Sequence, residues 1–325
     1  MRSLFAVALA LTTACVAPAG AQTYPSRTVT LVVPYTAGGP TDTLARLLAE
    51  HMRGSLGQPV IVEDVPGAGS TIGVARVAHA AGDGYTICIG TWTSHVGAPA
   101  IYPVHFDVLT DFEPVAMLPL APTMIIGKKT LPADDLKGLI AWLKANPGKA
   151  LGGTVGAGSP SHVAGIFFQQ RTGTQFRFVP YKGGSASMQD LVAGQIDLRM
   201  GAEASQTLPF LHSGAIKAFA ILGRNRWFAA PEIPTVDEAG VPGLYLTFWN
   251  GMWVPRGTPK EVIARLNAAV VRALADPAMR QRFAALGFEL PAADERTPEA
   301  LRAFHKAEIE RWWPIIKSAG IKLNQ

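Results

Sequence analysis

The chain has 325 residues, of which 48% are hydrophobic and 16% are charged, and this suits a large core divided between two α/β lobes. Its formal net charge is +5. The 29 basic residues are spread along the sequence rather than gathered in a block, which argues against a nucleic-acid-binding protein.

The first residues predict a secretory signal peptide. Arg2 gives a positive amino end, Leu4–Leu11 form a short apolar run, and Ala19-Gly20-Ala21 is a small-x-small cleavage site. The apolar run is too short to span a membrane. We therefore expect a mature periplasmic chain that begins near Gln22. Its formal charge would be +4, because cleavage removes Arg2 and no acidic residue.

The two cysteines bear on processing and on stability. Cys15 would be the modified residue of a lipoprotein, but LTTAC has a threonine where such sites usually carry an apolar residue, which disfavours this alternative. After cleavage only Cys88 remains, in the strand-like stretch TICIG, and it has no internal disulfide partner. The exported protein must therefore be held together by its core.

The stretch TLVVPYTAGGPTDTLAR predicts a strand, a loop of small residues and a helix. The strand covers Leu31–Pro34, the loop Tyr35–Asp42, and the helix 41–55. Unpaired N–H groups and the positive end of the helix dipole favour an anion at such a helix start. No Lys or Arg lies between Tyr35 and Ala45, so amides and hydroxyls would make the main contacts. The same pattern also occurs in glycine turns that bind nothing.

The next segment carries a glycine pattern that does not match a dinucleotide-binding fingerprint. A strand is predicted at 60–63, and Gly67, Gly69 and Gly73 follow it with the spacing GxGxxxG. The fingerprint has a different spacing and belongs after the first strand, which lacks it. We therefore expect close helix packing here, and no nucleotide or other cofactor.

A second strand–loop–helix unit of the same design follows later in the chain. It consists of a strand at 152–155, the loop Gly156–His162 and a helix from His162 to Arg171, with Ser161 as the N-cap. Ligands of open α/β sheets bind outside the carboxyl ends of the strands. If the two units lie in opposite lobes, their loops face each other across a cleft.

The order of elements predicts that the chain crosses twice between two lobes. It leaves the first lobe near residue 120, and the aromatic stretch 244–254 reads as a strand that returns to it. Two crossovers indicate a hinged, bilobal binding protein. The predicted fold class is α/β, with a mixed sheet flanked by helices in each lobe. The predicted boundaries are a signal peptide at 1–21, lobe 1 at 22–120 and 252–325, and lobe 2 at 121–251.

Residues suited to catalysis are scarce. The seven histidines are scattered without a metal-ligand spacing, and there is neither a GxSxG elbow nor a phosphate-binding P-loop. Ser159, Ser161 and His162 leave open an exported hydrolase, although no acidic partner for them can be named. Glu203 has two open interpretations, since it could accept a ligand amine or cap the next helix. We expect a binding protein rather than an enzyme, and no metal.

Several stretches together resemble the Bug family of extracytoplasmic solute-binding proteins, the receptors of tripartite tricarboxylate transporters. They follow the family's order over nearly the whole mature chain. The matching stretches are YPSRTVTLVVPYTAGGPTDTLAR, VEDVPGAGSTIGVARVA with GDGYT, LIAWLKANPGK, GAGSPSHVAG, FVPYKGGSASMQDLVAGQID, IPTVDEAGVPG and PRGTPKEVIARLNAAV.

This resemblance implies a Venus-flytrap fold of the periplasmic-binding-protein type that closes over a small organic acid. The acid would be a mono- or dicarboxylate, in some members an aromatic acid or an amino acid. Its carboxylate would be held between the loops Tyr35–Asp42 and Gly156–His162 by amides, hydroxyls and ordered water. Together with Tyr181, at a predicted strand end, and Glu203, the predicted ligand-binding residues are Tyr35, Ala37, Gly38, Gly39, Thr41, Asp42, Gly158, Ser159, Ser161 and His162.

The resemblance is incomplete at the far end of the ligand. The family often has an acidic residue at about Gly201, whereas this chain carries Glu203 instead. Family rules for recognising an amino group therefore transfer poorly. The implied partners are the acid ligand and membrane permease subunits, and we expect a monomer. A receptor that serves a sensor kinase is an alternative that the sequence does not separate from transport.

Overall fold

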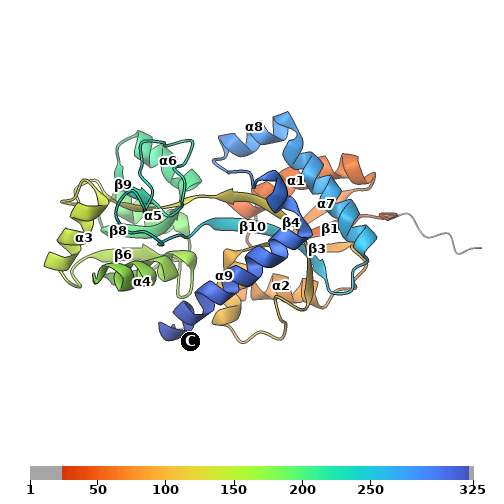
Figure 1. Cartoon of the computed structure of the whole chain (residues 1–325), viewed down its shortest axis with the longest axis horizontal. Coiled ribbons are helices and arrows are strands. Elements are labelled where there is room, and N and C mark those ends of the chain that lie inside the picture. Colours follow the sequence, from red (N-terminus) through yellow and green to blue (C-terminus); the bar gives the residue numbers. More distant parts are fainter. Residues whose placement is uncertain (1–23, 322–325) are drawn as a thin grey trace, which may run out of the picture.

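The computed structural model describes residues 24–321, so the predicted signal peptide and Cys15 lie outside the described residues. Within that range the strands form two five-stranded mixed sheets, in the orders β2-β1-β3-β10-β4 and β7-β6-β8-β5-β9. Figure 1 shows the sheets in two lobes side by side, each flanked by helices, and this confirms the predicted fold class. No helix in this range combines the length and apolar character needed to cross a bilayer.

In the first sheet β1 lies parallel to β2 and β3, and β10 pairs antiparallel with both β3 and β4. The strands are β1 (Val29–Val33), β2 (Val60–Asp64), β3 (Thr86–Thr91), β4 (Phe112–Ala121) and β10 (Phe248–Pro255). The helices of this lobe are α1 (Pro40–Leu56), α2 (Thr71–Ala78), α7 (Lys260–Ala275), α8 (Pro277–Ala285) and α9 (Pro298–Ser318). Its short helical turns are η1 (Ala68–Ser70), η2 (Thr93–Gly97), η3 (Ala98–Ala100) and η4 (Ala293–Arg296).

In the second sheet β6 lies parallel to β7 and β8, and β5 pairs antiparallel with β8 and β9. The strands are β5 (Thr123–Lys128), β6 (Leu151–Thr154), β7 (Arg177–Pro180), β8 (Leu198–Glu203) and β9 (Ile216–Ile221). The helices are α3 (Leu136–Ala145), α4 (Pro160–Thr172), α5 (Gly184–Val192) and α6 (Ala204–His212).

Both faces of each sheet are covered, which explains why central strands such as β1 and β5 are largely apolar. Along β1, Leu31 and Val33 pack in a cluster with α1, α7 and α8, whereas Val32 packs in another cluster with α2 and α9. In the second sheet, Met124 of β5 faces α5 and α6, and its neighbour Ile125 faces α3 and α4. Alternate residues of a strand thus enter different cores.

The chain crosses between the sheets at Pro122, which separates β4 from β5, and again just before β10. The two crossings are bonded together, because the Thr123 hydroxyl donates to the Leu246 carbonyl. Asn250 reinforces the junction by donating from Nδ2 to the Pro119 carbonyl at 2.7 Å. The predicted strand at 244–254 is wrong in its first four residues: 244–247 form the irregular second crossing, and the pairing begins at Phe248.

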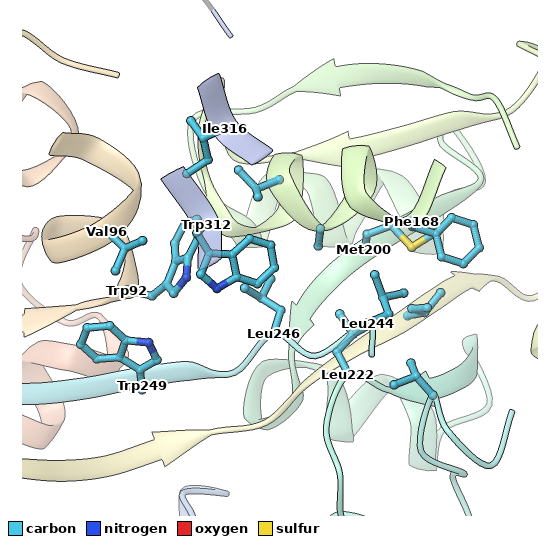
Figure 2. Close-up of a cluster of buried hydrophobic side chains, with 14 of the residues drawn as sticks. Trp92, Val96, Phe168, Met200, Leu222, Leu244, Leu246, Trp249, Trp312 and Ile316 are labelled. Carbon is cyan, nitrogen blue, oxygen red and sulfur yellow. The ribbon is translucent and has the colours of Figure 1, made fainter. Parts of the chain in front are cut away.

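One hydrophobic cluster continues from one lobe into the other (Figure 2). Trp312 of α9 packs edge-to-face on Trp92, with ring centroids 5.7 Å apart. It makes a similar contact with Phe167 of α4 in the second lobe, at 5.6 Å. Figure 2 shows Trp92 and Trp312 next to each other, with Leu246 of the second crossing near them. The apolar surface beneath the crossings is therefore shared by both lobes.

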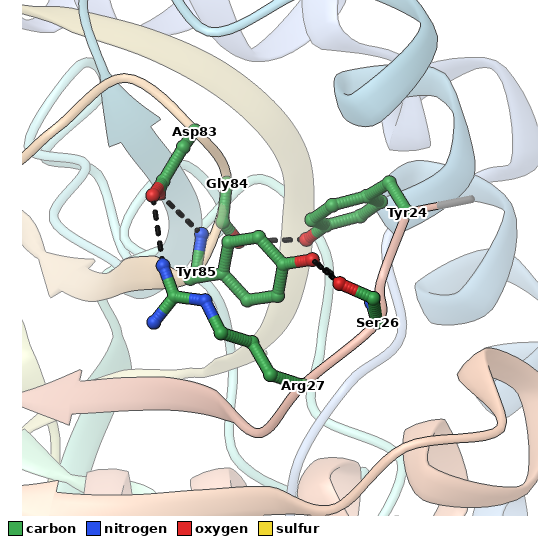
Figure 3. A network of polar contacts seen from close by, with 6 residues as sticks. All are labelled: Tyr24, Ser26, Arg27, Asp83, Gly84 and Tyr85. Atoms are coloured by element: carbon green, nitrogen blue, oxygen red, sulfur yellow. Dashed lines mark hydrogen bonds and ion pairs between the residues drawn. The ribbon is translucent and has the colours of Figure 1, made fainter. Parts of the chain in front are cut away.

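A polar network fixes the first described residues against the turn that precedes β3 (Figure 3). The Tyr24 hydroxyl donates to the Gly84 carbonyl at 2.6 Å, and the Ser26 amide donates to the Tyr85 hydroxyl at 2.8 Å. Arg27 pairs with Asp83 at 3.0 Å. These contacts tie the segment that leads into β1 to the segment that leads into β3, its neighbour in the sheet.

Candidate functional site

A cavity of about 260 Å³ lies between the two lobes, where the carboxyl ends of several strands meet. The first lobe contributes Tyr35, which follows β1, and Thr93, which follows β3. The second lobe contributes the loops after β6 and β7 and the end of β8. Cavity-lining residues of the second lobe include Val155, Ser159, Ser161, Gly184, Arg199, Glu203 and Gln206. Two further cavities, of about 330 and 420 Å³, share residues with it and extend the cleft between the lobes.

The loop after β1 is held by Asp42. Its Oδ2 accepts from the Gly38 amide at 2.7 Å, and its Oδ1 lies 2.7 Å from Arg46 Nε. Asp42 is buried, and Gly38 has φ +80°, a backbone conformation that favours glycine. Asp42 therefore shapes the loop through Oδ2, whereas Oδ1 pairs with Arg46 one turn further along α1. Ala37, also predicted as a ligand residue, lies exposed next to it.

The start of α1 provides backbone donors. Pro40 occupies its first position and Gly39 is the N-cap, so the helix begins one residue earlier than the sequence predicts. The first i to i−4 hydrogen bond runs from the Thr43 amide to the Gly39 carbonyl at 2.9 Å. The amides of Thr41 and Asp42 precede that bond and belong to the unpaired first turn of a helix, which favours an anion.

Tyr35 is positioned by hydroxyl contacts within the first lobe. Its Oη lies 2.5 Å from Thr91 Oγ1, which also accepts from the Thr93 amide at 3.1 Å. Desolvation raises the pKa of the Tyr35 phenol above its ordinary value. Tyr35 is therefore a neutral hydrogen-bonding group at the cavity wall.

The loop after β6 is built around Ser159, which is the N-cap of α4. Its Oγ accepts from the His162 amide at 3.3 Å and donates to the Gly156 carbonyl at 2.7 Å. The prediction of Ser161 as the N-cap is wrong, because Pro160 takes the first helical position and the cap precedes it. Ser161 Oγ instead accepts from the Val155 amide at 3.1 Å.

His162 supports this loop rather than a serine nucleophile. Its Nδ1 accepts from the Gly158 amide at 3.1 Å, and its ring packs edge-on against Phe178 with centroids 4.6 Å apart. Desolvation lowers the pKa of the imidazole, so it is neutral at pH 7. Ser161 Oγ lies 3.1 Å from Ser159 Oγ. This arrangement gives no support to the hydrolase alternative, which needs a serine–histidine hydrogen bond.

Tyr181 and Glu203 are the remaining predicted residues, and both belong to the second lobe. The Tyr181 hydroxyl donates to Asp190 Oδ2 at 2.7 Å. Glu203 occupies the N-cap position of α6, but its side chain does not cap that helix, so the capping interpretation is wrong. Its Oε2 accepts from Gln206 Nε2 at 3.0 Å, and the enclosed surroundings of the carboxyl raise its pKa to about 7.

Arg199 is the cavity residue that sequence reasoning missed. It lies in β8 and is only 4% exposed, yet it lines the cavity. Desolvation lowers its pKa to about 10, so the guanidinium stays charged at pH 7. The signal was an arginine between the apolar residues Leu198 and Met200 of a strand, where a buried charge must be compensated by another group. Within residues 24–321 there is no cluster of three or more His, Cys, Asp or Glu suited to a metal ion.

Comparison with known proteins covers nearly the whole chain. The family model described as "Tripartite tricarboxylate transporter family receptor" matches residues 44–321. BugT of Bordetella pertussis is 35% identical over 326 residues, which cover 99% of this chain and 99% of that protein. A protein of Agrobacterium vitis, described as the UPF0065 protein in the TAR-I ttuE-ttuC' intergenic region, is 38% identical over 317 residues, covering 95% of this chain and 90% of its own.

Solved structures with the same two-lobed arrangement extend this similarity. MatC from Rhodopseudomonas palustris, solved with bound malate, is 37% identical with a TM-score of 0.79, covering 90% of this chain and 100% of its own. Rpa4515 of R. palustris, solved with adipate, is 33% identical with a TM-score of 0.81, covering 92% and 99%. The periplasmic binding protein BugD is 38% identical with a TM-score of 0.78, covering 93% and 100%.

Proposed function

The chain belongs to the Bug (TctC) family of receptors of tripartite tricarboxylate transporters, and on that premise we propose how it captures its ligand. It is a solute-binding receptor for a small carboxylate, as its relatives with malate and adipate indicate. The observation that carries the proposal is the cavity between the lobes, lined on both sides by loops that follow parallel strands. Ligands of open α/β folds bind at this place.

In the proposed complex, one carboxylate of the ligand lies between the loops Tyr35–Asp42 and Gly156–His162. The unpaired first-turn amides of α1 and α4 would donate to it, together with the Tyr35 hydroxyl at the cavity wall. Neither loop contains a lysine or arginine. Binding therefore depends on hydrogen bonds from oriented backbone groups, as expected of an anion held at helix starts. Asp42 and His162 hold the two loops in shape by accepting from the Gly38 and Gly158 amides.

We further propose that the receptor acts without chemistry, as a monomer, in the periplasm after removal of residues 1–21. The lobes, predicted at 22–120 with 252–325 and at 121–251, move about the crossings at Pro122 and 244–247; because β10 belongs to the first sheet, we place the second boundary at 248. A ligand that binds the closed arrangement more tightly shifts the lobes toward it. The closed receptor is then recognised by membrane permease subunits, the partners that its family implies.

A thermal-shift screen of aliphatic and aromatic carboxylic acids tests the proposal. A binder at 100 times its dissociation constant adds about 2.7 kcal/mol to the free energy of unfolding. We expect at least one acid to raise the melting temperature and no ester or amide substrate to be turned over. Failure of every organic acid to stabilise the protein would contradict the proposal.

Replacing Gly39 by leucine tests the position of the carboxylate. Gly39 has an ordinary φ of −79°, and the nearest atom to an added Cβ is the Thr36 carbonyl oxygen at 3.5 Å, so the change leaves the fold intact. The new side chain stands at the start of α1 and should abolish the response to acids. Gly54→Leu, on an exposed turn of the same helix with no atom within 4 Å of an added Cβ, is the matched control. The control should respond to acids like the wild type.

A further inference from the structure

One end of the cavity between the lobes contains a buried positive charge without a counter-ion. Arg199 is 4% exposed, and no hydrogen bond or ion pair among the described side chains uses its guanidinium. Its Nε is enclosed and has no acceptor. An unpaired charge removed from water costs several kcal/mol, so a fold retains one only where something else compensates for it.

The backbone makes room for this side chain at two glycines. A Cβ added to Gly153 of β6 would lie 3.4 Å from Arg199 Cγ, so the aliphatic stem runs over that strand. A Cβ added to Gly184, at the start of α5, would lie 3.6 Å from Arg199 Nη2. Gly184 also lines the cavity. The guanidinium therefore ends beside the cavity wall at the first residue of a helix.

The groups around the guanidinium also favour an anion. The helix α5 has nine residues, and its N-cap, Gly183, provides no side chain to bond the first amides. Gln206 presents its amide to the same cavity. Glu203 is the acidic residue whose charge acts on Arg199, but the two form no ion pair among the described residues, and Glu203 Oε1 also lacks a hydrogen-bond partner. Arg199 Nε and Glu203 Oε1 are thus two buried polar atoms at this cavity that no described side chain bonds.

We infer that Arg199 binds a second anionic group at the far end of the ligand, so that the receptor selects dicarboxylates over monocarboxylates and amino acids. The inference rests on the proposed function, because the first carboxylate must lie between the two loops. A guanidinium forms two parallel hydrogen bonds with a carboxylate. Glu203, when protonated, donates to the same group.

An ammonium group at the far end is the competing possibility, since Glu203 is acidic. The guanidinium opposes it, because Arg199 is charged and lacks an ion pair among the described residues, whereas Glu203 Oε2 already accepts a hydrogen bond from Gln206. An ammonium in this place would meet a like charge in surroundings of low dielectric. The far end of the cavity therefore suits a carboxylate better than an amine.

Calorimetric titration of three matched ligands decides between these possibilities. For each chain length, a diacid is compared with the monoacid and with the amino acid whose ammonium stands at the far end. Glutarate and adipate, with their monoacid and ω-amino counterparts, cover two lengths. We expect the better-fitting diacid to bind at least about tenfold more tightly than both counterparts. Equal or tighter binding of the monoacid or of the amino acid would overturn the inference.

Arg199→Met tests the residue itself, since methionine fills a similar length without charge. We expect it to reduce the affinity for the diacid to that of the monoacid and to leave the monoacid affinity unchanged. Arg177→Met, at an exposed position of β7 in the same lobe, is the matched control and should keep the preference for the diacid. An Arg199→Met variant that retains the preference would contradict the inference. Should this variant not fold, the wild-type comparison of ligands still decides.

The same titrations separate this inference from the proposed function. If no carboxylic acid binds, the proposed function fails. If monoacids and diacids bind equally well, the receptor function stands and the role of Arg199 is wrong.

Discussion

Arg199 and Glu203 share one poorly solvated environment, and each responds in the direction that reduces its charge. Desolvation lowers the pKa of Arg199 to about 10 and raises that of Glu203 to about 7. Their mutual attraction acts against both shifts and is the smaller effect. Near neutral pH the arginine therefore remains charged while the glutamic acid is partly protonated, which gives this end of the cavity a net positive charge.

Glu203 should make the stability of the free receptor depend on pH. Its pKa is higher in the folded chain than in the unfolded chain, so its favourable contribution is complete below about pH 4.5 and is lost as the pH rises through about 7. The slope is at most about 1.4 kcal/mol per pH unit. Urea unfolding of the wild type and of Glu203→Gln at pH 5 and pH 8 measures it.

As the pH rises from 5 to 8, we expect the unfolding free energy of Glu203→Gln to increase relative to that of the wild type. Glu299→Gln, at an exposed position in the first turn of α9, is the control and should follow the wild type at both pH values. Parallel pH profiles for wild type and Glu203→Gln would show that the Glu203 carboxyl is not desolvated.

The sequence predicted some of the cavity-lining residues and missed others. Tyr35 and Ser159 line the cavity because they follow strands β1 and β6, and the carboxyl end of a strand is visible as the end of an apolar run. Arg199 lies within a predicted strand, and the sequence pattern there predicts the strand but not the direction of this side chain. Its direction toward the cavity depends on Gly153 and Gly184, which come from other elements. Such a contact has no local signal.

In the proposed complex the starts of α1 and α4 hold the ligand carboxylate. At α4 the N-cap and the preceding loop depend on each other. The Ser159 hydroxyl bonds both the His162 amide and the Gly156 carbonyl, so the residue that begins the helix also folds the loop. The shape of the loop Gly156–His162 at the cavity wall therefore depends on this serine. A change at Ser159 should therefore affect both the stability of the fold and the affinity for the ligand.

Ser159→Ala should reduce both the stability of the receptor and its affinity for acids. Loss of an N-cap costs about 1 kcal/mol of unfolding free energy. Asp135→Ala removes a comparable cap, because Asp135 Oδ1 accepts from the Gly138 amide at 2.6 Å at the start of α3 in the same lobe. Both variants should lose similar stability in urea, and only Ser159→Ala should bind acids more weakly in calorimetry. Equal affinities for acids in the two variants would contradict the proposal that the start of α4 holds the carboxylate.

The positions of elements were predictable where side chains alternate or where proline marks a helix start. The strand–loop–helix units at β1 and β6 are confirmed. The stretch 244–247 was not, because its aromatic and apolar residues are typical of a strand. They are buried instead by the hydrophobic cluster beneath the crossings, and Leu246 bonds to Thr123 and Leu222 rather than to a neighbouring strand. Tertiary packing overrides local propensity here.

At the scale of the whole molecule, the hydrophobic cluster shared by the lobes restrains their relative motion. Figure 1 shows α9 extending from the first lobe toward α4 of the second. Trp312 of α9 joins Trp92 on one side and Phe167 on the other. The hinge therefore consists of the two chain crossings and of the shared cluster, because opening the cleft must also change the packing around Trp312.

Trp312→Ala should loosen the arrangement of the lobes as well as destabilise the protein. Replacing a buried tryptophan by alanine costs about 3–5 kcal/mol. Trp227→Ala is the matched control: Trp227 is equally buried, but its cluster lies wholly within the second lobe. Both variants should lose comparable stability, whereas only Trp312→Ala should broaden the distance distribution of the ligand-free protein in small-angle scattering. A saturating acid should narrow that distribution again, because ligand binding favours the closed arrangement. Unchanged scattering in Trp312→Ala, or the same broadening in Trp227→Ala, would show that the shared cluster does not restrain the lobes.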